Sequence, residues 1–296
     1  MEAQKPQPQA APQAAAKPAE KPAARPAKPA QAPKKKNNAP GIKNAFWVIL
    51  ICFLVALCLF FFVFGDMFGV FHNFDSEGHP QNLLGTIRKG GVIVPILQTL
   101  LLTVFVLAVE RFIALRAAKG KGNIAKFVAN VKAALAKNDI KGAQALCDKQ
   151  GGSVAAVVAA ALVRYEEMDK NTVLTKEQKI TTLQKEVEEA TALEMPTLQQ
   201  NLPIVATMTT LGTLVGLLGT VIGMIKSFQA LAQSGAPDST ELSTGISEAL
   251  INTAFGIATG AFAVIFYNYY TNKIDNLTYA IDEIGFSIVQ TFAATH

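Results

Sequence analysis

The sequence predicts an all-α membrane protein with four transmembrane helices and a large helical cytoplasmic domain. Half of its 296 residues are apolar, and the mean hydropathy is positive. Two runs, Ala45–Phe64 and Gly91–Val109, contain no charged residue over 20 and 19 positions. Because a helix rises about 1.5 Å per residue, runs of this length cross a hydrocarbon core of about 30 Å. The composition therefore favours a membrane protein over a soluble one.

The chain begins with a segment whose composition cannot bury a core. Residues 1–44 are rich in Ala, Pro, Lys and Gln, which predicts a disordered tail. Docking of a partner on its Pro-Lys run is the alternative. The next run, "AFWVILICFLVALCLFFFVF" at 45–64, starts too late and is too long for a signal peptide, so it predicts an extra N-terminal transmembrane helix.

The middle of the chain alternates between apolar and charged segments. A loop at 65–90 leads to a second transmembrane helix at 91–115. Residues 116–201 are charged and Ala-rich, with apolar positions at helical spacing, which predicts a helical domain outside the membrane. We expect Pro196 and Pro203 to bend the helix that leads from this domain into the membrane, without necessarily ending it.

Two more spans complete the predicted membrane domain. Residues 202–226 form the third and residues 247–272 the fourth, with a loop at 227–246 between them. The last stretch, 273–296, again has apolar residues at helical spacing and predicts a C-terminal helix.

The distribution of basic residues predicts the orientation. Nine Lys and Arg precede the first span and fourteen lie between Arg111 and Gln200, whereas the 65–90 loop has two. Because Lys and Arg gather on the cytoplasmic side, we expect both termini and the 116–201 domain to be cytoplasmic. The loops at 65–90 and 227–246 then face outward.

The third span carries glycines inside an apolar helix. At about 100° per residue, they fall within about 60° of one another and allow a neighbouring helix to approach closely. The four positions are Gly212, Gly216, Gly219 and Gly223. Thr220 lies beside this strip, and the simplest role for its hydroxyl is a bond to the carbonyl one turn back.

The fourth span repeats this design with Gly256 on a face of small residues, Thr253 on one border and Glu248 on the other. An ionisable group at membrane depth is costly and indicates a function. The alternative is that the Glu248 carboxylate rests in the interface, exposed to water.

Other kinds of site find little support. The cysteines Cys52, Cys58 and Cys147 have no CxxC spacing, so neither a disulfide framework nor a zinc site is indicated. The loop "HNFDSEGH" contains possible metal ligands, but no helix fixes their spacing, and we expect no metal and no cofactor. No nucleophile–base pair, phosphate loop or catalytic carboxylate pair is present, so we expect no enzyme. The basic cytoplasmic face fits orientation and contact with anionic membrane lipids better than nucleic acid binding.

Two motifs carry a family resemblance. "LVGLLGTVIGMIKSF" followed by "GISEALINTAFGIATGAFAVIFYNYY" resembles the MotA/TolQ/ExbB proton channel family, its ExbB branch in particular. The resemblance extends over about residues 85 to 290 and leaves out the tail and the first span. One departure is Phe262, where the family usually carries a proline, so the kink of the last span is not defined by the resemblance.

The resemblance implies an assembly and a site. It implies a pentameric ring in which the last two spans of each subunit surround a pore, with tight subunit packing on the glycines. An ExbD-like single-span partner inside the pore would supply a proton-carrying aspartate. By motif, Thr220 and Thr253 are the pore threonines that face this partner, and Glu248 is the acidic residue near the pore.

The function implied is that of an ExbB-like subunit in the inner membrane of a Gram-negative bacterium. With an ExbD-like partner and a TonB-like protein, it would couple the proton motive force to outer-membrane transport. The alternatives are a TolQ-like or gliding-type motor subunit of the same family and a non-conducting membrane scaffold.

Overall fold

A computed structural model of the chain describes residues 45–66, 72–74, 80–233 and 239–295. The described residues are nearly all helical, with one isolated β-bridge between Phe74 and Pro80. Four helical segments in this part of the chain are long and apolar enough to cross a membrane, and they begin in α1, α3, α8 and α9. The predicted all-α fold with four candidate spans is confirmed. The predicted tail at 1–44 lies outside the described residues.

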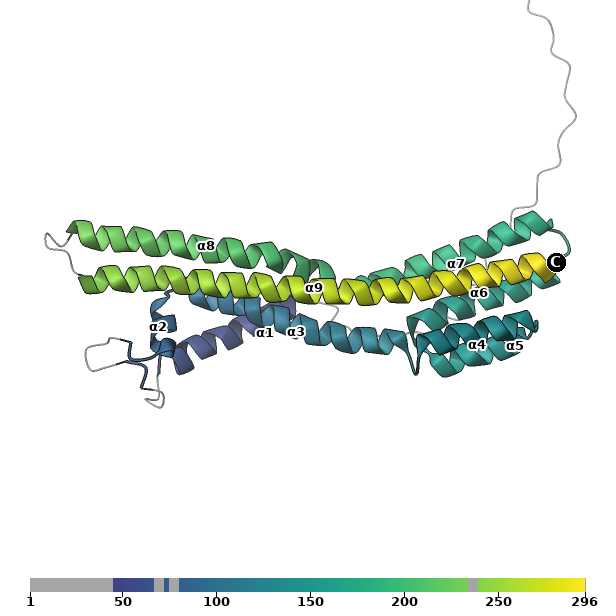
Figure 1. Cartoon of the computed structure of the whole chain (residues 1–296), viewed down its shortest axis with the longest axis horizontal. Coiled ribbons are helices and arrows are strands. Elements are labelled where there is room, and N and C mark those ends of the chain that lie inside the picture. The colour runs from purple at the N-terminus through teal and green to yellow at the C-terminus, as the bar shows by residue number, and fades with distance from the viewer. Residues whose placement is uncertain (1–44, 67–71, 75–79, 234–238, 296) are drawn as a thin grey trace, which may run out of the picture. The chain divides into compact units, whose positions relative to one another are not determined.

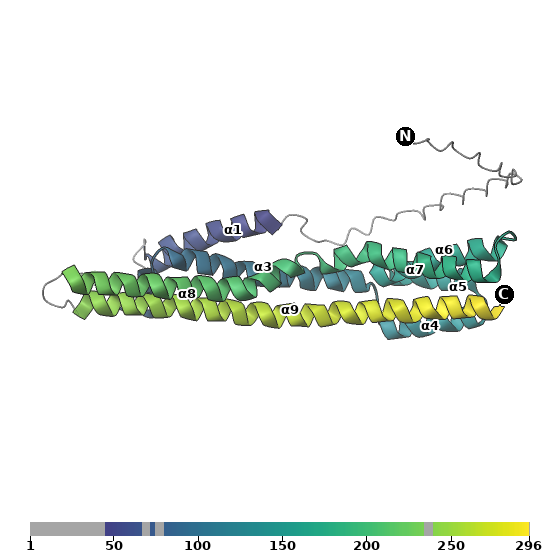
Figure 2. The ribbon, with the colours of Figure 1, turned by 90° about the horizontal axis from the view of Figure 1, so that it is seen from above.

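The candidate spans pack around one long helical hairpin. Helix α8 (Leu202–Gln233) and helix α9 (Ser239–Thr295) lie side by side, and α3 (Ile93–Lys119) packs against both (Figure 1). Helix α1 (Ala45–Cys58), extended by the π-helical segment η1 (Leu59–Phe64), lies along α3 (Figure 2). The short helix α2 (Leu83–Lys89) connects η1 to α3.

The second half of α9 leaves α8 and packs against the helices of the 116–201 region. The four helices of this region are α4 (Ile124–Ala136), α5 (Ile140–Gln150), α6 (Gly152–Lys170) and α7 (Lys176–Gln199). Helix α9 contacts α4, α6 and α7, as Figure 2 shows. Their shared core is aliphatic and includes the fully buried Leu162, Leu183 and Ile284. Burial of such side chains contributes about 1.5–3 kcal/mol each, so this core fixes the end of α9.

The junction between α7 and α8 differs from the expected bend. Helix α7 ends at Gln199 and α8 begins at Leu202, and Asn201 between them adopts φ 62°. Asparagine tolerates this left-handed conformation better than most residues. Pro203 then stands in the first turn of α8, where a missing N–H costs no helical hydrogen bond. The chain therefore breaks between the two prolines instead of bending through them.

No break separates the fourth predicted span from the C-terminal helix. Helix α9 runs 57 residues without interruption, through Phe262 and past position 272. The Phe262 ring lies 5.0 Å from the ring of Phe105 on α3, measured between centroids. An aromatic contact therefore occupies the position where the resembling family usually carries a proline.

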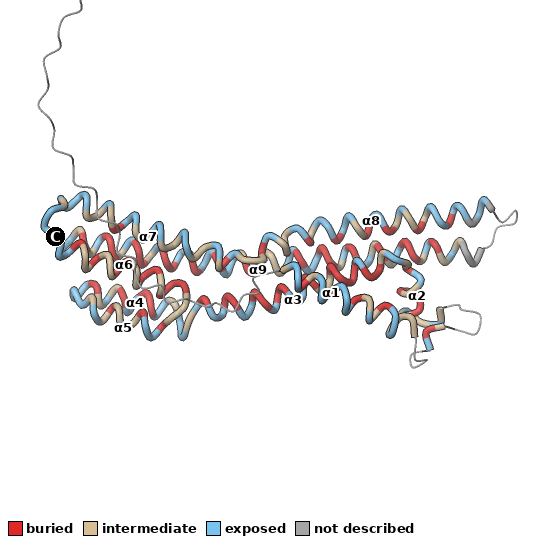
Figure 3. Tube along the Cα trace, turned by 180° about the vertical axis from the view of Figure 1, so that it is seen from behind, coloured by how far each residue is buried: buried red, intermediate tan, exposed pale blue. Residues whose placement is uncertain are grey.

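Burial divides α8 into two faces. In Figure 3 the buried stretches of α8 alternate with exposed ones along its length, whereas α3 is buried over much of its surface. Many of the exposed positions of α8 are apolar, among them Leu214, Leu217 and Val221, although Thr207, Thr210 and Thr213 are exposed as well. Apolar exposure of this extent is expected where a helix meets lipid or another membrane helix.

Candidate functional site

The glycines of α8 lie against α9 of the same chain. A Cβ placed at Gly216 would meet the carbonyl oxygen of Asn252 and the Cα of Gly256, each at 2.9 Å. At Gly223 a Cβ would lie 3.0 Å from the Ala249 Cβ. The two backbones approach so closely that only glycine fits without a shift. Gly212 and Gly219 likewise lie against Thr259 and Asn252, so α9 of the same chain covers the strip that was expected to join neighbouring subunits.

Two threonine hydroxyls meet across this hairpin. The Oγ1 atoms of Thr220 and Thr253 form a hydrogen bond with each other, and each hydroxyl also lies 3.2 Å from a carbonyl of its own helix. Both side chains are half-buried. A threonine hydroxyl can donate one hydrogen bond and accept others, so the pair forms a polar point in an apolar hairpin.

Glu248 is held by a cation and a backbone turn. Its Oε1 accepts a hydrogen bond from the Nζ of Lys226 at 2.9 Å. The side chain of Glu248 is 11% exposed and that of Lys226 is 53% exposed. Gly91, with φ +75°, approaches the carboxylate so closely that a Cβ there would clash with Oε1. The carboxylate is therefore enclosed and paired, and the exposed Lys226 links it to the surface.

Asn252 ties the same region to the start of α3. Its side chain is fully buried, and its Nδ2 donates to the carbonyl of Gly90 at 3.2 Å. Its Oδ1 is buried without a hydrogen-bond partner among the described residues. Because Asn252 lies one turn after Glu248, the two side chains share one face of α9. They hold the α2–α3 connection against α9.

The predicted site residues thus fall into two groups. Thr220 and Thr253 are brought together, whereas no hydrogen bond in the described part of the chain joins Glu248 to either of them. Thr253 follows Glu248 by five positions, which is a rotation of about 140° around the helix and a rise of about 7.5 Å. The acid and the hydroxyl pair therefore face different sides of α9.

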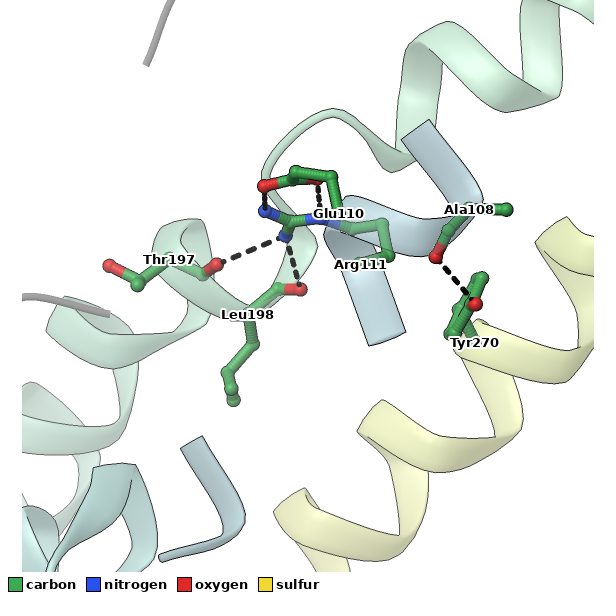
Figure 4. Close-up of polar contacts among 6 residues, drawn as sticks. All are labelled: Ala108, Glu110, Arg111, Thr197, Leu198 and Tyr270. Atoms are coloured by element: carbon green, nitrogen blue, oxygen red, sulfur yellow. Dashed lines mark hydrogen bonds and ion pairs between the residues drawn. The ribbon is translucent and has the colours of Figure 1, made fainter. Parts of the chain in front are cut away.

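A buried ion pair lies where α3 meets the α7–α8 junction (Figure 4). The guanidinium of Arg111 donates two hydrogen bonds to the Glu110 carboxylate, at 2.5 and 2.7 Å. It also reaches the carbonyls of Thr197 and Leu198 at 3.4 Å. These carbonyls belong to the last turn of α7, which has no further helical N–H to bond. Arg111, which is fully buried, therefore closes the end of α7.

Helix α9 joins this region through one more hydrogen bond. The hydroxyl of Tyr270 donates to the carbonyl of Ala108 at 2.6 Å. Together with the Arg111 contacts, it connects α3, α7 and α9 at the boundary between the two halves of the helical unit.

Reasoning from the sequence did not identify Lys226, Gly91 or the role of Arg111. The only available signal was that Lys226 ends a long uncharged run and that Arg111 follows Glu110 at the end of another. Their partners lie 22 and about 86 residues away, and sequence spacing does not define such contacts. Of the loop residues considered as metal ligands, His72 is exposed, and Asp75, Glu77 and His79 lie outside the described residues.

Comparison with known proteins gives a match over the hairpin and the helices before it. Residues 150–283 match the model of a family described as the MotA/TolQ/ExbB proton channel family. The chain is 37% identical over 93 residues to an ExbB-like biopolymer transport protein of Synechocystis sp.. It is 38% identical over 88 residues to the Tol-Pal system protein TolQ of Pseudomonas aeruginosa. It is also 31% identical over 84 residues to the biopolymer transport protein ExbB of Salmonella typhimurium.

These similarities are partial. They cover 29%, 30% and 28% of this chain, and 44%, 38% and 34% of the three relatives. The chain thus matches between about a third and a half of the length of each relative. An ExbB protein and a TolQ protein match this chain over segments of comparable length, so the two matches do not distinguish ExbB from TolQ.

Proposed function

Because the chain belongs, through residues 150–283, to the MotA/TolQ/ExbB proton channel family, we propose that it is an ExbB-like proton-channel subunit. It would act with an ExbD-like partner and a TonB-like protein to couple the proton motive force to outer-membrane transport. The observation that carries this proposal is the polar content of the α8–α9 hairpin. The family match covers α8 and α9 as far as residue 283, so it includes both the threonine pair and Glu248.

The chemistry of the hairpin supports a proton route. Hydroxyls and a carboxylate are costly in a lipid environment, and residues of this kind inside membrane helices mark ion pathways and proton relays. The hydroxyls of Thr220 and Thr253 can hold a water beside a partner's carboxylate without changing charge near neutral pH. Glu248 can exchange a proton, and its ion pair with Lys226 sets the charge at one end of the route.

The proposed assembly is a homopentamer around the partner. Support comes from the apolar α8 surface, where Leu214 is 62% exposed and Leu217 is 59% exposed in the single chain. Since α9 already covers the glycine strip, subunit contacts would use this exposed surface instead. The side of the hairpin that carries Thr220 and Thr253 would face the partner.

The proposed location is the inner membrane of a Gram-negative bacterium with both termini in the cytoplasm. The count of basic residues supports this orientation. Cysteine labelling from outside intact cells tests it. A cysteine at the exposed His72 should react and one at the exposed Lys121 should not, whereas the reverse pattern would overturn the orientation.

Proton flux tests the proposed activity. The chain is reconstituted in liposomes with and without an ExbD-like subunit, and acidification is followed under an imposed potential. We expect flux only with the partner, and we expect Thr220→Val together with Thr253→Val to reduce it. Absence of flux in an assembled complex would favour the non-conducting scaffold.

A TolQ-like role is the second candidate, because the TolQ protein of Pseudomonas aeruginosa matches at 38% identity. A gliding-type motor is a third member of the same class. Co-purification distinguishes these machines: recovery of a TonB-like protein supports the first role, and recovery of Tol-Pal components supports the second. The genes that neighbour this one provide the simplest independent check.

A further inference from the structure

A hollow of about 590 Å³ lies beside the end of the first candidate span, and its lining includes Gly91, which approaches Glu248. Its volume falls within the range of about 300–1,000 Å³ that is typical of small-molecule sites. It is lined by the aromatic Phe60, Phe61 and Phe74, the basic Arg88 and Lys89, and Gly91 and Val92. No carboxylate is among the lining residues. The hollow therefore combines apolar walls with two positive charges.

The guanidinium of Arg88 is fixed by aromatic rings. Its central carbon lies 4.0 Å from the centroid of the Phe60 ring and 5.0 Å from that of Phe61. Cation–π contacts use the face of the guanidinium and leave N–H groups along its edge. No hydrogen bond or ion pair with another described residue accompanies these contacts, and the same is true of Lys89 in the described chain.

The surrounding loop is held by a hydrogen-bond network. The Asn73 Nδ2 donates to the carbonyls of Val63 and Phe64 at the end of η1, at 2.7 and 3.2 Å. Its Oδ1 accepts from the Nδ2 of Asn82, whose own Oδ1 caps α2 by accepting from Gly85 N. Because these bonds connect η1 to α2, Arg88 at the end of α2 is placed over the rings of η1 before any ligand arrives.

The electrostatics favour an anionic ligand. Partial burial lowers the pKa of Arg88, because removal from water disfavours the charged guanidinium. A phosphate placed against this edge would offset the desolvation and accept two hydrogen bonds from the fork. Lys89, which is exposed beside it, would add a second positive charge.

The rim of the hollow favours a lipid over a soluble phosphate. Val92 is 81% exposed and Phe61 is 50% exposed; Phe61 lies in the last turn of the first candidate span, and Val92 directly precedes the second. Aromatic and long basic side chains at such a position are suited to the headgroup region of a bilayer. Apolar rim residues would contact the acyl chains while the two cations face the phosphate.

We propose that this hollow binds the phosphate of an anionic phospholipid, with Arg88 as the forked donor and Lys89 as the second cation. The inference does not depend on proton conduction. It explains why the only two basic residues of the 65–90 loop stand together at its end. It also gives the first candidate span a role, since Phe60 and Phe61 at its end form one wall.

Native mass spectrometry of the full chain in detergent tests the proposal. The probes are phosphatidylglycerol and phosphatidylcholine with identical acyl chains, titrated separately. We expect tighter binding of phosphatidylglycerol. A basic residue near a membrane surface contributes about 1 kcal/mol to binding of anionic lipid, so each of Arg88→Ala and Lys89→Ala should weaken it about fivefold. The double variant should weaken binding of phosphatidylglycerol about 25-fold. The affinity of Arg88→Lys should lie between those of the double variant and the wild type.

Matched controls define the outcomes. Lys126→Ala with Lys176→Ala removes the same charge from exposed positions on α4 and α7 and should leave binding unchanged. Equal binding of the two lipids, or full phosphatidylglycerol affinity in the double variant, would overturn the proposal. Displacement of the lipid by inorganic phosphate at equal concentration would identify a soluble-anion site instead. Displacement by an acidic protein segment would identify a protein interface.

A measurement on the wild-type chain covers the case in which the alanine variants unfold. A photoactivatable phosphatidylglycerol is crosslinked to the protein, and the modified peptides are identified. We expect crosslinks at 60–61 and 88–92 that unlabelled phosphatidylglycerol suppresses and phosphatidylcholine does not. Crosslinks spread evenly over the exposed face of α8 would contradict a defined site.

Discussion

Lys226 near the end of α8 and Glu248 near the start of α9 form an ion pair of 2.9 Å that closes the hairpin beside Gly91. Lys226→Met should leave the Glu248 carboxylate enclosed without a partner. Because Lys226 is half exposed, we expect a modest loss, about 1 kcal/mol of unfolding free energy. Glu248→Gln should lower the unfolding free energy by less than Lys226→Met does. The double variant should be destabilised by less than the sum of the two single variants. Unfolding in detergent, followed by circular dichroism, measures the coupling; strictly additive effects would show that the pair is not coupled.

The hydrogen bond between Thr220 and Thr253 predicts a graded response. Valine keeps the shape and removes the hydroxyl, so Thr220→Val and Thr253→Val should each cost about 0.5–1.5 kcal/mol of stability. They should also lower partner-dependent transport, and serine should be milder at both positions. The exposed Thr207, which bonds only its own helix, provides the control. Full transport in correctly assembled Val variants would place the route elsewhere.

The contact at Gly216 predicts that the hairpin itself depends on glycine. Gly216→Ala should force a small separation of α8 and α9, and Gly216→Leu should cost about 1–3 kcal/mol or more. Leu217→Met, on the exposed side of the same turn, should have little effect. Thermal unfolding of the detergent-solubilised chain is the measurement. Unchanged stability of Gly216→Leu would contradict the close approach of the two backbones.

The buried pair of Glu110 and Arg111 predicts a larger effect. Glu110→Gln or Arg111→Met removes one charge and leaves the other buried, which typically costs about 3–5 kcal/mol. Arg111→Lys keeps the charge but cannot bond Glu110 and the α7 carbonyls together, so it should also destabilise. Arg116→Lys, exposed on the same helix, should stay within about 0.5 kcal/mol of wild type. Limited proteolysis at 199–201 should report the loosened α7–α8 junction, and wild-type resistance in Arg111→Met would exclude this role.

The burial of Cys147 predicts a pH-dependent stability. Burial, together with the charge of Asp148, raises the pKa of this thiol to about 12 from 9.0. The neutral thiol is therefore favoured in the folded state, and its stabilising contribution is present below about pH 9 and is lost between about pH 9 and 12.

In a background that lacks Cys52 and Cys58, Cys147 should resist maleimide at pH 8 until the protein unfolds. A cysteine at the exposed Ala133 should react at once, and equal rates would contradict the burial of Cys147.

The sequence by itself determined the class of fold and the position of its apolar segments. Hydropathy and helical spacing are local properties, so the uncharged run at 45–64 and the glycine repeat in α8 are visible without a structure. The quoted motifs of the hairpin were likewise enough to indicate the family that residues 150–283 match.

Only the tertiary structure decided which residues meet. Each contact between helices depends on a rotation and a register that side chains from distant parts of the chain set together. Packing of Gly216 against Gly256 places Thr220 opposite Thr253 and sends Glu248 to another side of α9. The break at Asn201 brings the carbonyls of α7 to Arg111, a contact over about 86 residues. No local pattern encodes such distances, because the free energy that fixes them comes from close packing of the assembled helices.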